Sequence, residues 1–498
     1  MPELSRRVQT FTDSVIRRMT RISDEVDAIN LSQGFPDFPP PKAITDRLRE
    51  VADEGPHQYS VTFGAENFRE ALARKQGRAY GREINPDTEI LVTCGGTEAM
   101  MSAMMTVCNP GDKVVVFSPF YENYGADAIL SGADPIFVPL IPPTFDFDRN
   151  VLEDAFRQHP KAIIVCNPSN PCGKVFTKDE LLFIGGLCNR YDAYMITDEV
   201  YEHIVFAPYH HVYAGALPEI ADRVICCSSL SKTYSITGWR LGYIIAPPEI
   251  IDRAKKVHDF LTVGAAAPLQ EAVIPGLKFG QDYYDDLLAK YTHKKELFLK
   301  GLDDLHIVHN DPEGVYYVLL DISEFGYDSD LKFCEDLARL VGVGAVPGSS
   351  FFREPVNHLI RFHFAKKDET LLNALNRLES LRSKTPLPQK ELKGTALKRE
   401  ASQEQGLSVS RAARNPRCPR LQRYYPGVTF LPSMTMGATD AHHYEQICDT
   451  CLRCSPFMAE PQEAAAGVHG TNERIPVRAY LQGIRVLIDL MEHVNLSC

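Results

Sequence analysis

An amine, a carboxylate and two groups that bind phosphate lie close to the ends of short apolar runs in this chain. Lys232 follows one such run, and a lysine at a strand end forms Schiff bases when its pKa is depressed. Ser229 and Arg240, on either side of it in sequence, are natural phosphate ligands. Asp198 directly follows a second apolar run, where a carboxylate is unfavourable unless it is paired or functional. These residues mark a candidate active site.

Three further motifs at the ends of apolar runs are less specific. Gly95, Gly96 and Thr97 precede a helical pattern, so that backbone N–H groups and the positive end of the helix dipole would face a phosphate. Tyr121 is either a ring that stacks on a planar ligand or a core aromatic. Asn170 belongs to the second of two Asn-Pro pairs and either presents a hydrogen-bond donor to a ligand or only shapes the turn. A phosphate site, a stacked ring, a carboxylate and an amine together match the needs of pyridoxal phosphate.

The segments that position this chemistry follow an alternating pattern. Short runs rich in Val, Ile and aromatic residues alternate with amphipathic segments such as 178–192. Short buried strands that alternate with helices indicate an α/β fold with a mainly parallel sheet, which binds ligands beyond the carboxyl ends of its strands. The expected strands lie in 89–96, 113–119, 134–140, 162–171, 193–201, 223–232 and 241–247.

The pattern changes after about residue 250. Residues 250–261 and 282–302 have helical spacing. Beyond residue 303, strand-like runs mix with helical segments, which predicts a second, smaller α+β lobe. Its expected strands lie in 314–322 and 359–365, and its expected helices in 330–342 and 367–384.

The segment 229–242, SLSKTYSITGWRLG, resembles the cofactor-attachment signature of class I and II aminotransferases, with every position compatible. The resemblance covers about residues 5–383 and includes the motifs LSQGFPDFPPP, HQYSVTFGAENFREAL, NPSNPCG and DEVYEHIVF. It implies PLP fold type I, in which a mainly parallel seven-stranded sheet is flanked by helices and joined to a smaller α+β lobe. The N-terminal wording is similar to the kynurenine, methionine and aromatic branch of the family.

For the cofactor, pyridoxal 5'-phosphate, the resemblance implies a role for each matching residue. Lys232 forms the Schiff base and then acts as general base and acid in the 1,3-prototropic shift. Asp198 keeps the pyridine nitrogen protonated, and Tyr121 stacks on the ring. Tyr201 and Asn170 hydrogen-bond the phenolic oxygen. The phosphate is bound by Gly95, Gly96, Thr97, Ser229 and Arg240.

For the substrate, the resemblance points to a smaller set of residues. Arg361 matches the arginine that grips the α-carboxylate with a bidentate fork, and Asn170 lies beside the substrate as well. Gly34 lies where the mobile N-terminal segment of the family covers the substrate. Tyr59 resembles the tyrosine that reaches the phosphate of the neighbouring subunit, which implies a homodimer with shared sites.

The activity implied by the resemblance is transfer of an amino group from an L-amino acid to a 2-oxo acid. In the aspartate-specific branch a cation from the neighbouring subunit grips the side-chain carboxylate, whereas the corresponding stretch here, 260–270, has no Arg or Lys. We therefore expect an aromatic, methionine-like or other apolar amino acid, paired with glutamate or 2-oxoglutarate. Two alternatives stay open: a carbon–sulfur β-lyase on the same fold, and an inactive fusion chain.

Composition excludes several other classes of protein. The 498 residues carry a formal net charge of −12, which argues against bulk binding of nucleic acid. No apolar stretch reaches the roughly 18 residues typical of a membrane span, and the N-terminal segment lacks the apolar core of a secretory signal. The 13 cysteines are odd in number and scattered, which favours reduced thiols in the cytoplasm over a disulfide framework.

The expected organisation has five parts. A basic linker, expected to be disordered, separates the aminotransferase-like region from a C-terminal fragment. The parts are an N-terminal arm (1–35), a large PLP-binding domain (36–275), a small domain (276–383), the linker (384–425) and the fragment (426–498).

The C-terminal fragment resembles the last segment of the M20 zinc peptidase catalytic domain in its motifs GATDAHHY and HGTNE. His469 matches a zinc ligand of that family, but the HxD pair, the bridging Asp and the Glu-Glu pair are absent. One imidazole does not make a catalytic zinc site, which needs about three protein ligands. A rival site at Cys448, Cys451 and Cys454 lacks the fourth cysteine at the spacing of an iron–sulfur run. We therefore expect no peptidase activity and no bound metal.

Overall fold

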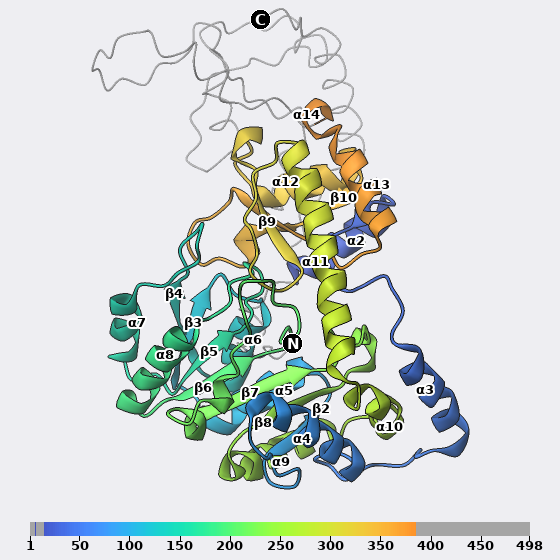
Figure 1. The fold of residues 1–498 in the computed structure, drawn as a ribbon. Coiled ribbons are helices and arrows are strands. Elements are labelled where there is room, and N and C mark those ends of the chain that lie inside the picture. Colours follow the sequence, from blue (N-terminus) through green and yellow to red (C-terminus); the bar gives the residue numbers. More distant parts are fainter. Residues whose placement is uncertain (1–4, 6–13, 385–498) are drawn as a thin grey trace, which may run out of the picture. The chain divides into compact units, whose positions relative to one another are not determined.

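The computed structural model describes residue 5 and residues 14–384 of the chain (Figure 1). The expected linker and the C-terminal fragment, with His469 and the cysteine motif, lie outside the described residues. No helix within 14–384 combines the length and the apolar character that a membrane span requires.

A seven-stranded sheet carries the predicted chemistry at the ends of its strands. Its order is β2-β8-β7-β6-β5-β3-β4, and all neighbours are parallel except on the two sides of β8. Each strand lies inside a run predicted from sequence, so the mainly parallel α/β fold is confirmed. The strands are β2 Ile90–Thr93, β3 Lys113–Ser118, β4 Asp134–Pro139, β5 Ala162–Cys166, β6 Tyr194–Asp198, β7 Val224–Ser229 and β8 Gly242–Ile245.

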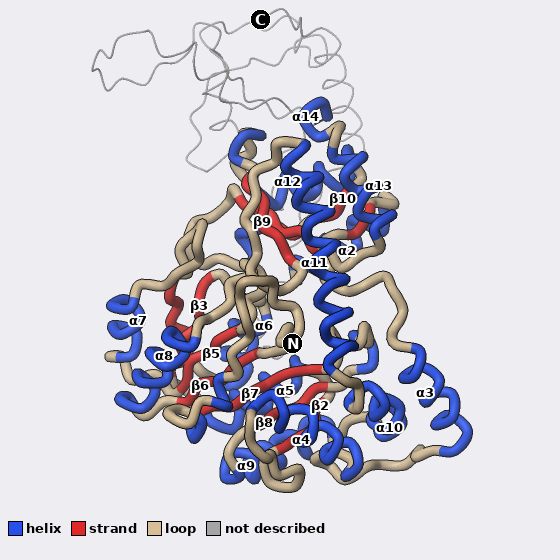
Figure 2. Tube along the Cα trace, viewed as in Figure 1, coloured by secondary structure: helices blue, strands red, loops and turns tan. Residues whose placement is uncertain are grey.

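Helices cover both faces of this sheet, because successive side chains of a buried strand point to opposite faces. On β5, Ile163 and Val165 pack toward α7 and α8, whereas Ile164 packs toward α5, α6 and α9. Figure 2 shows these helices beside the strands. They are α5 Gly96–Val107, α6 Asn123–Ser131, α7 Arg149–Phe156, α8 Lys178–Tyr191 and α9 Pro248–Thr262.

A third apolar cluster surrounds β2 and β8. Ile90, Val92 and Tyr243 pack there with side chains from α3, α4 and α10. Helix α11 then runs from this region to the second lobe (Figure 1). These helices are α3 Lys42–Glu54, α4 Glu66–Tyr80, α10 Ala267–Leu277 and α11 Gln281–Asp304.

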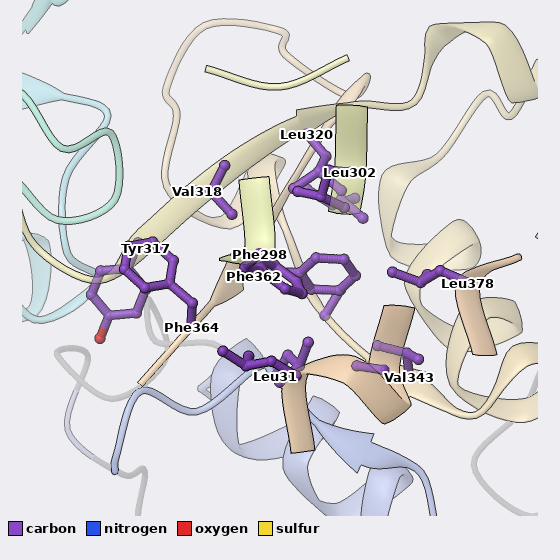
Figure 3. Packing of buried hydrophobic residues seen from close by; sticks show 14 of the residues in the cluster. Leu31, Phe298, Leu302, Tyr317, Val318, Leu320, Val343, Phe362, Phe364 and Leu378 are labelled. Carbon is purple, nitrogen blue, oxygen red and sulfur yellow. The ribbon is translucent and has the colours of Figure 1, made fainter. Parts of the chain in front are cut away.

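The second lobe is built on a three-stranded antiparallel sheet of order β11-β12-β9. Leu31, Phe298, Val343, Phe362 and Leu378 meet in its core, so segments far apart in sequence are joined there (Figure 3). The lobe matches the predicted α+β pattern. Its strands are β9 Tyr317–Asp321, β11 Val346–Pro347 and β12 Leu359–His363, with the pair β1 Ile29–Asn30 and β10 Val343–Gly344, and its helices are α2 Val15–Glu25, α12 Asp330–Asp336, α13 Asp368–Leu378 and α14 Leu381–Lys384.

Candidate active site

A cavity of about 460 Å³ lies beyond the carboxyl ends of β5, β6 and β7. Its volume falls in the ~300–1,000 Å³ range of small-molecule sites. The second lobe contributes Tyr317 and Arg361 to its wall. The residues predicted from sequence that line it are Gly34, Gly96, Thr97, Tyr121, Asn170, Asp198, Tyr201, Ser229, Lys232, Arg240 and Arg361.

Lys232 lies in the turn after β7, and its amine faces the cavity. Its Nζ donates a hydrogen bond to the carbonyl of Gly34 at 3.1 Å. Burial lowers the pKa of the Lys232 amine, and the nearby Tyr317 and Asp198 oppose that effect. A larger fraction of the amine is therefore neutral at a given pH, which is the form that attacks a carbonyl and accepts a proton.

Asp198 ends β6 and is 8% exposed. Its Oδ2 accepts a hydrogen bond from the hydroxyl of Tyr124 at 2.7 Å, and its Oδ1 accepts one from the N–H of Val200 at 3.3 Å. Burial raises the pKa of Asp198, while these two donors and the charge of Lys232 act in the opposite direction. The carboxylate is thus buried but supplied with donors.

One end of the cavity is suited to a phosphate. Gly96 and Thr97 form the first turn of α5, whose N–H groups have no partner within the helix. Ser229 and Arg240 line the same cavity, and Nη1 of Arg240 donates to the carbonyl of Thr237 at 2.9 Å. Arg240 has a left-handed backbone with φ of 54°, an uncommon conformation for a non-glycine residue that clusters at ligand sites.

Gly95 and Tyr59 do not line this cavity. Gly95 precedes α5 with φ of 86°, and a Cβ there would overlap the guanidinium of Arg240, so glycine is required for that packing. Tyr59 is 88% exposed and lies apart from the cavity. The contact of Tyr59 with a neighbouring subunit therefore stays a prediction.

Arg361, on β12, is 1% exposed. Its Nη1 donates to Oδ1 of Asn170 at 2.7 Å, and its Nη2 donates to the carbonyl of Ser32 at 3.0 Å. The guanidinium lies 4.1 Å from the centre of the Tyr317 ring, while its buried Nε has no hydrogen-bond partner. A guanidinium that is held in this way and lines the cavity is a candidate partner for a carboxylate.

Aromatic side chains line the cavity between these groups. Tyr121 meets Tyr124 edge to face, with ring centres 5.9 Å apart. The hydroxyl of Tyr201 donates to that of Tyr317 at 3.0 Å. Gly34 has no room for a side chain, because a Cβ there would overlap the Tyr317 hydroxyl.

Several cavity residues were missed by sequence reasoning. Tyr317 lies within an ordinary strand pattern, and Tyr124 and Asp127 lie within an ordinary helical pattern. Arg17 and Gln33 reach the cavity from α2 and the segment after β1. Asp127, a buried acid on α6, is the member of this set that a sequence signal could have identified, by its place on an otherwise apolar face.

The donor set is compatible with pyridoxal phosphate. The cavity offers N–H groups, a serine and an arginine for a phosphate, a lysine with a lowered pKa, and a buried carboxylate with its own donors. No group of three or more His, Cys, Asp or Glu side chains in residues 14–384 is arranged to hold a metal ion.

Comparisons with known proteins agree with this arrangement. The model of the family "Aminotransferase class I and II" matches residues 26–378. Methionine aminotransferase of Escherichia coli strain K12 is 35% identical over 369 residues, which cover 74% of this chain and 96% of that protein. Kynurenine–oxoglutarate transaminase 3 of Rattus norvegicus is 31% identical over 398 residues, with 74% and 88% covered. The crystal structure of an Escherichia coli protein with methionine aminotransferase function has a TM-score of 0.73 at 33% identity, covering 76% of this chain and 100% of that one.

Proposed function

Because this chain belongs to the class I and II aminotransferases, which depend on pyridoxal phosphate, we propose that Lys232 holds that cofactor and moves the proton during amino transfer. The observation that carries the proposal is the meeting of three groups in one cavity: the Lys232 amine with its lowered pKa, the Asp198 carboxylate and the Arg361 guanidinium. The comparisons do not favour the alternative β-lyase, since the relatives above are named aminotransferases.

The chain's residues divide the work of binding the cofactor. The first turn of α5, at Gly96 and Thr97, binds the phosphate together with Ser229 and Arg240. Asp198 holds a proton on the pyridine nitrogen, and Tyr121 supports the ring face. Bound in this way, the cofactor supplies an electron sink for charge that develops at the substrate Cα.

On the substrate side, Arg361 binds the α-carboxylate and fixes the orientation of the Cα–H bond, while Asn170 holds the guanidinium in place. Once the substrate amine has displaced Lys232 from the cofactor, the freed Lys232 amine would take the proton from the substrate Cα as a general base and return a proton as a general acid. Tyr201 and Asn170 are assigned to the phenolic oxygen. The second half-reaction uses the same groups in reverse order with a 2-oxo acid.

The experiment is to fix the cofactor on its lysine. Borohydride reduction of the holoenzyme followed by peptide mass spectrometry should place the label on Lys232. Lys232→Ala should lose both the label and amino transfer. The matched control is Lys255→Ala, since Lys255 also has a pKa lowered by burial but lies outside the cavity. Label on another lysine, or turnover that survives in Lys232→Ala, would contradict the proposal.

For substrates we propose methionine or an aromatic amino acid paired with glutamate or 2-oxoglutarate. Relatives named for methionine and for kynurenine with oxoglutarate support this choice. The cavity lining includes the apolar Ile16 and Phe35, which suit an apolar side chain, and also Arg17, which suits the distal carboxylate of glutamate. Single-turnover assays with methionine, phenylalanine and aspartate test the proposal, and equal or faster turnover of aspartate would refute it.

We also propose a homodimer in which Tyr59 completes the partner's site. Tyr59, Val61, Phe260, Leu261 and Val263 are large apolar side chains with 44–92% exposure, as expected of a surface covered by a second copy. Co-refolding of Tyr59→Ala with Lys232→Ala tests it. If Tyr59 acts across the interface, the mixed dimer contains one intact site and regains activity; if Tyr59 acts within its own chain, no site is intact and activity stays lost.

The division of the chain proposed from sequence remains a proposal: 1–35, 36–275, 276–383, 384–425 and 426–498. We place the protein in the cytoplasm, and we propose that the M20-like last part has no peptidase activity. A chain truncated after Ser383 should keep amino transfer. Stoichiometric zinc or iron in the full-length protein would overturn the assignment of the last part.

A further inference from the structure

Asp127, on α6, is a buried acid of the cavity that no role above uses. It lines the cavity and is only 3% exposed. Its Oδ2 has no hydrogen-bond partner among the described residues. An ionised carboxylate in such surroundings is unfavourable, because no donor from the described residues replaces the lost hydration of Oδ2.

Helix α6 brings Asp127 to the same part of the cavity as Asp198. Tyr124 lies three residues before Asp127, hence on the same helix face, and its hydroxyl donates to Asp198. The titratable groups that face Asp127 from the sheet are Asp198 on β6 and Cys227 on β7, and neither is a cation. Burial, and then the charge of Asp198, raise the pKa of Asp127 well above its ordinary value.

Arg353 is a cation near α6 that packs over aromatic rings. Arg353 approaches Gly125 on that helix, but its guanidinium lies 5.0 Å from the centre of the Phe120 ring and 4.9 Å from that of Phe137. Asp198, in contrast, has a hydroxyl donor, an N–H donor and the charge of Lys232. Of the two carboxyl groups, Asp198 is therefore the one equipped to be an anion.

We propose that Asp127 is a positioning residue for Asp198: it stays a neutral carboxylic acid and so confines the single negative charge of the pair to Asp198. Two interacting buried carboxyl groups do not both ionise readily, and the one with donors keeps the charge. Asp127 also excludes water from that side of Asp198, which keeps the attraction between the carboxylate and the ring nitrogen unscreened. The inference rests on the proposed role of Asp198 toward the cofactor.

Infrared difference spectra of the holoenzyme near neutral pH test the protonation. A carbonyl band of a protonated carboxyl group, shifted in D₂O, is expected in the wild type and should be absent from Asp127→Asn. The matched control is Asp134→Asn, an exposed acid of β4 outside the cavity, which should keep the band. Absence of the band from the wild type, or its persistence in Asp127→Asn, would overturn the proposal.

Cofactor affinity tests the effect on Asp198. Asp127→Asn keeps shape and neutrality, so its cofactor Kd should stay within about twofold of the wild type, whereas Asp127→Ala admits water and should raise Kd about tenfold, a change of ~1.4 kcal/mol. A tenfold weakening in Asp127→Asn, or no change in Asp127→Ala, would refute the positioning role. Asp198→Asn separates the two proposals: if it binds the cofactor as tightly as the wild type, the role of Asp198 fails, whatever the infrared band of Asp127 shows.

Discussion

Replacing Tyr124 by phenylalanine removes one hydrogen bond from the carboxylate that we assign to the pyridine nitrogen. Tyr124 is 2% exposed, and its hydroxyl lies 2.7 Å from Oδ2 of Asp198. The substitution keeps the ring that packs against Tyr121 and deletes only the donor. The expected effect is therefore on the acidity of Asp198 and not on the packing of α6.

The size of this effect follows from the charge of the acceptor. A hydrogen bond to a charged group contributes about 1.5–3 kcal/mol, and one pKa unit corresponds to about 1.4 kcal/mol. The donor acts against burial, which already raises the pKa of Asp198, so its loss raises that pKa further. The carboxylate form then disappears at a higher pH as the solution is acidified.

The assay is the cofactor Kd of the two proteins measured across pH. At high pH, where Asp198 is ionised in both, the two should bind alike. On the acid side, the cofactor Kd of Tyr124→Phe should start to rise at a higher pH than that of the wild type and should exceed it by about tenfold or more. The matched control is Tyr327→Phe, which also removes a tyrosine–aspartate hydrogen bond, to Asp336 at 3.1 Å, but outside the cavity. Coincident acid limbs for Tyr124→Phe and the wild type would refute the reasoning.

Three further substitutions follow from the same geometry. Arg361→Lys removes the bidentate guanidinium and should raise the Michaelis constant for the amino acid about tenfold or more, since a hydrogen bond to a charged group contributes about 1.5–3 kcal/mol. An unchanged Michaelis constant would exclude Arg361 from carboxylate binding. Arg17→Gln should raise the Michaelis constant for the acceptor oxoglutarate about two- to fivefold and leave that for methionine unchanged. The control is Arg18→Gln, which removes an arginine that pairs with Glu335 and should alter neither constant. For Asp127, a raised folded-state pKa gives stability that is full below the ordinary carboxyl pKa and is lost as pH rises through the raised value. The Tm of cofactor-free Asp127→Asn should therefore rise relative to that of the wild type as the pH is raised above the ordinary carboxyl pKa, and parallel Tm curves would contradict this.

The site residues that could be predicted from the sequence are those that directly follow a strand in the same short segment. The run that forms β7 also carries Ser229 and leads into Lys232, and the run that forms β6 ends in Asp198. Buried parallel strands are continuous apolar runs, so a polar residue at their end stands out. The seven strands were identified for the same reason.

The parts of the site that sequence reasoning missed depend on contacts between distant segments. Arg361 and Asn170 were both predicted through the family resemblance, but the hydrogen bond between them joins residues 191 positions apart, and no local pattern encodes it. Tyr317 belongs to an unremarkable strand and becomes a cavity residue only because β9 pairs with β12. Asp127 is separated from Asp198 by 71 positions and acquires its unusual acidity from burial against the sheet, which is a tertiary effect.

The segment 32–34 holds the side chains of Arg361 and Lys232 in place. The carbonyl of Ser32 accepts a hydrogen bond from Nη2 of Arg361, and the carbonyl of Gly34 accepts one from Nζ of Lys232. A neutral carbonyl is a weaker acceptor for a cation than a carboxylate is, so in the role that we propose for Arg361 a substrate carboxylate would replace the carbonyl of Ser32 as its acceptor. Gly34 also accepts from the hydroxyl of Tyr316 at 2.9 Å, and that bond holds the segment in place when Lys232 turns to other partners. The same short segment thus satisfies both cations beforehand and leaves each of them available for reaction.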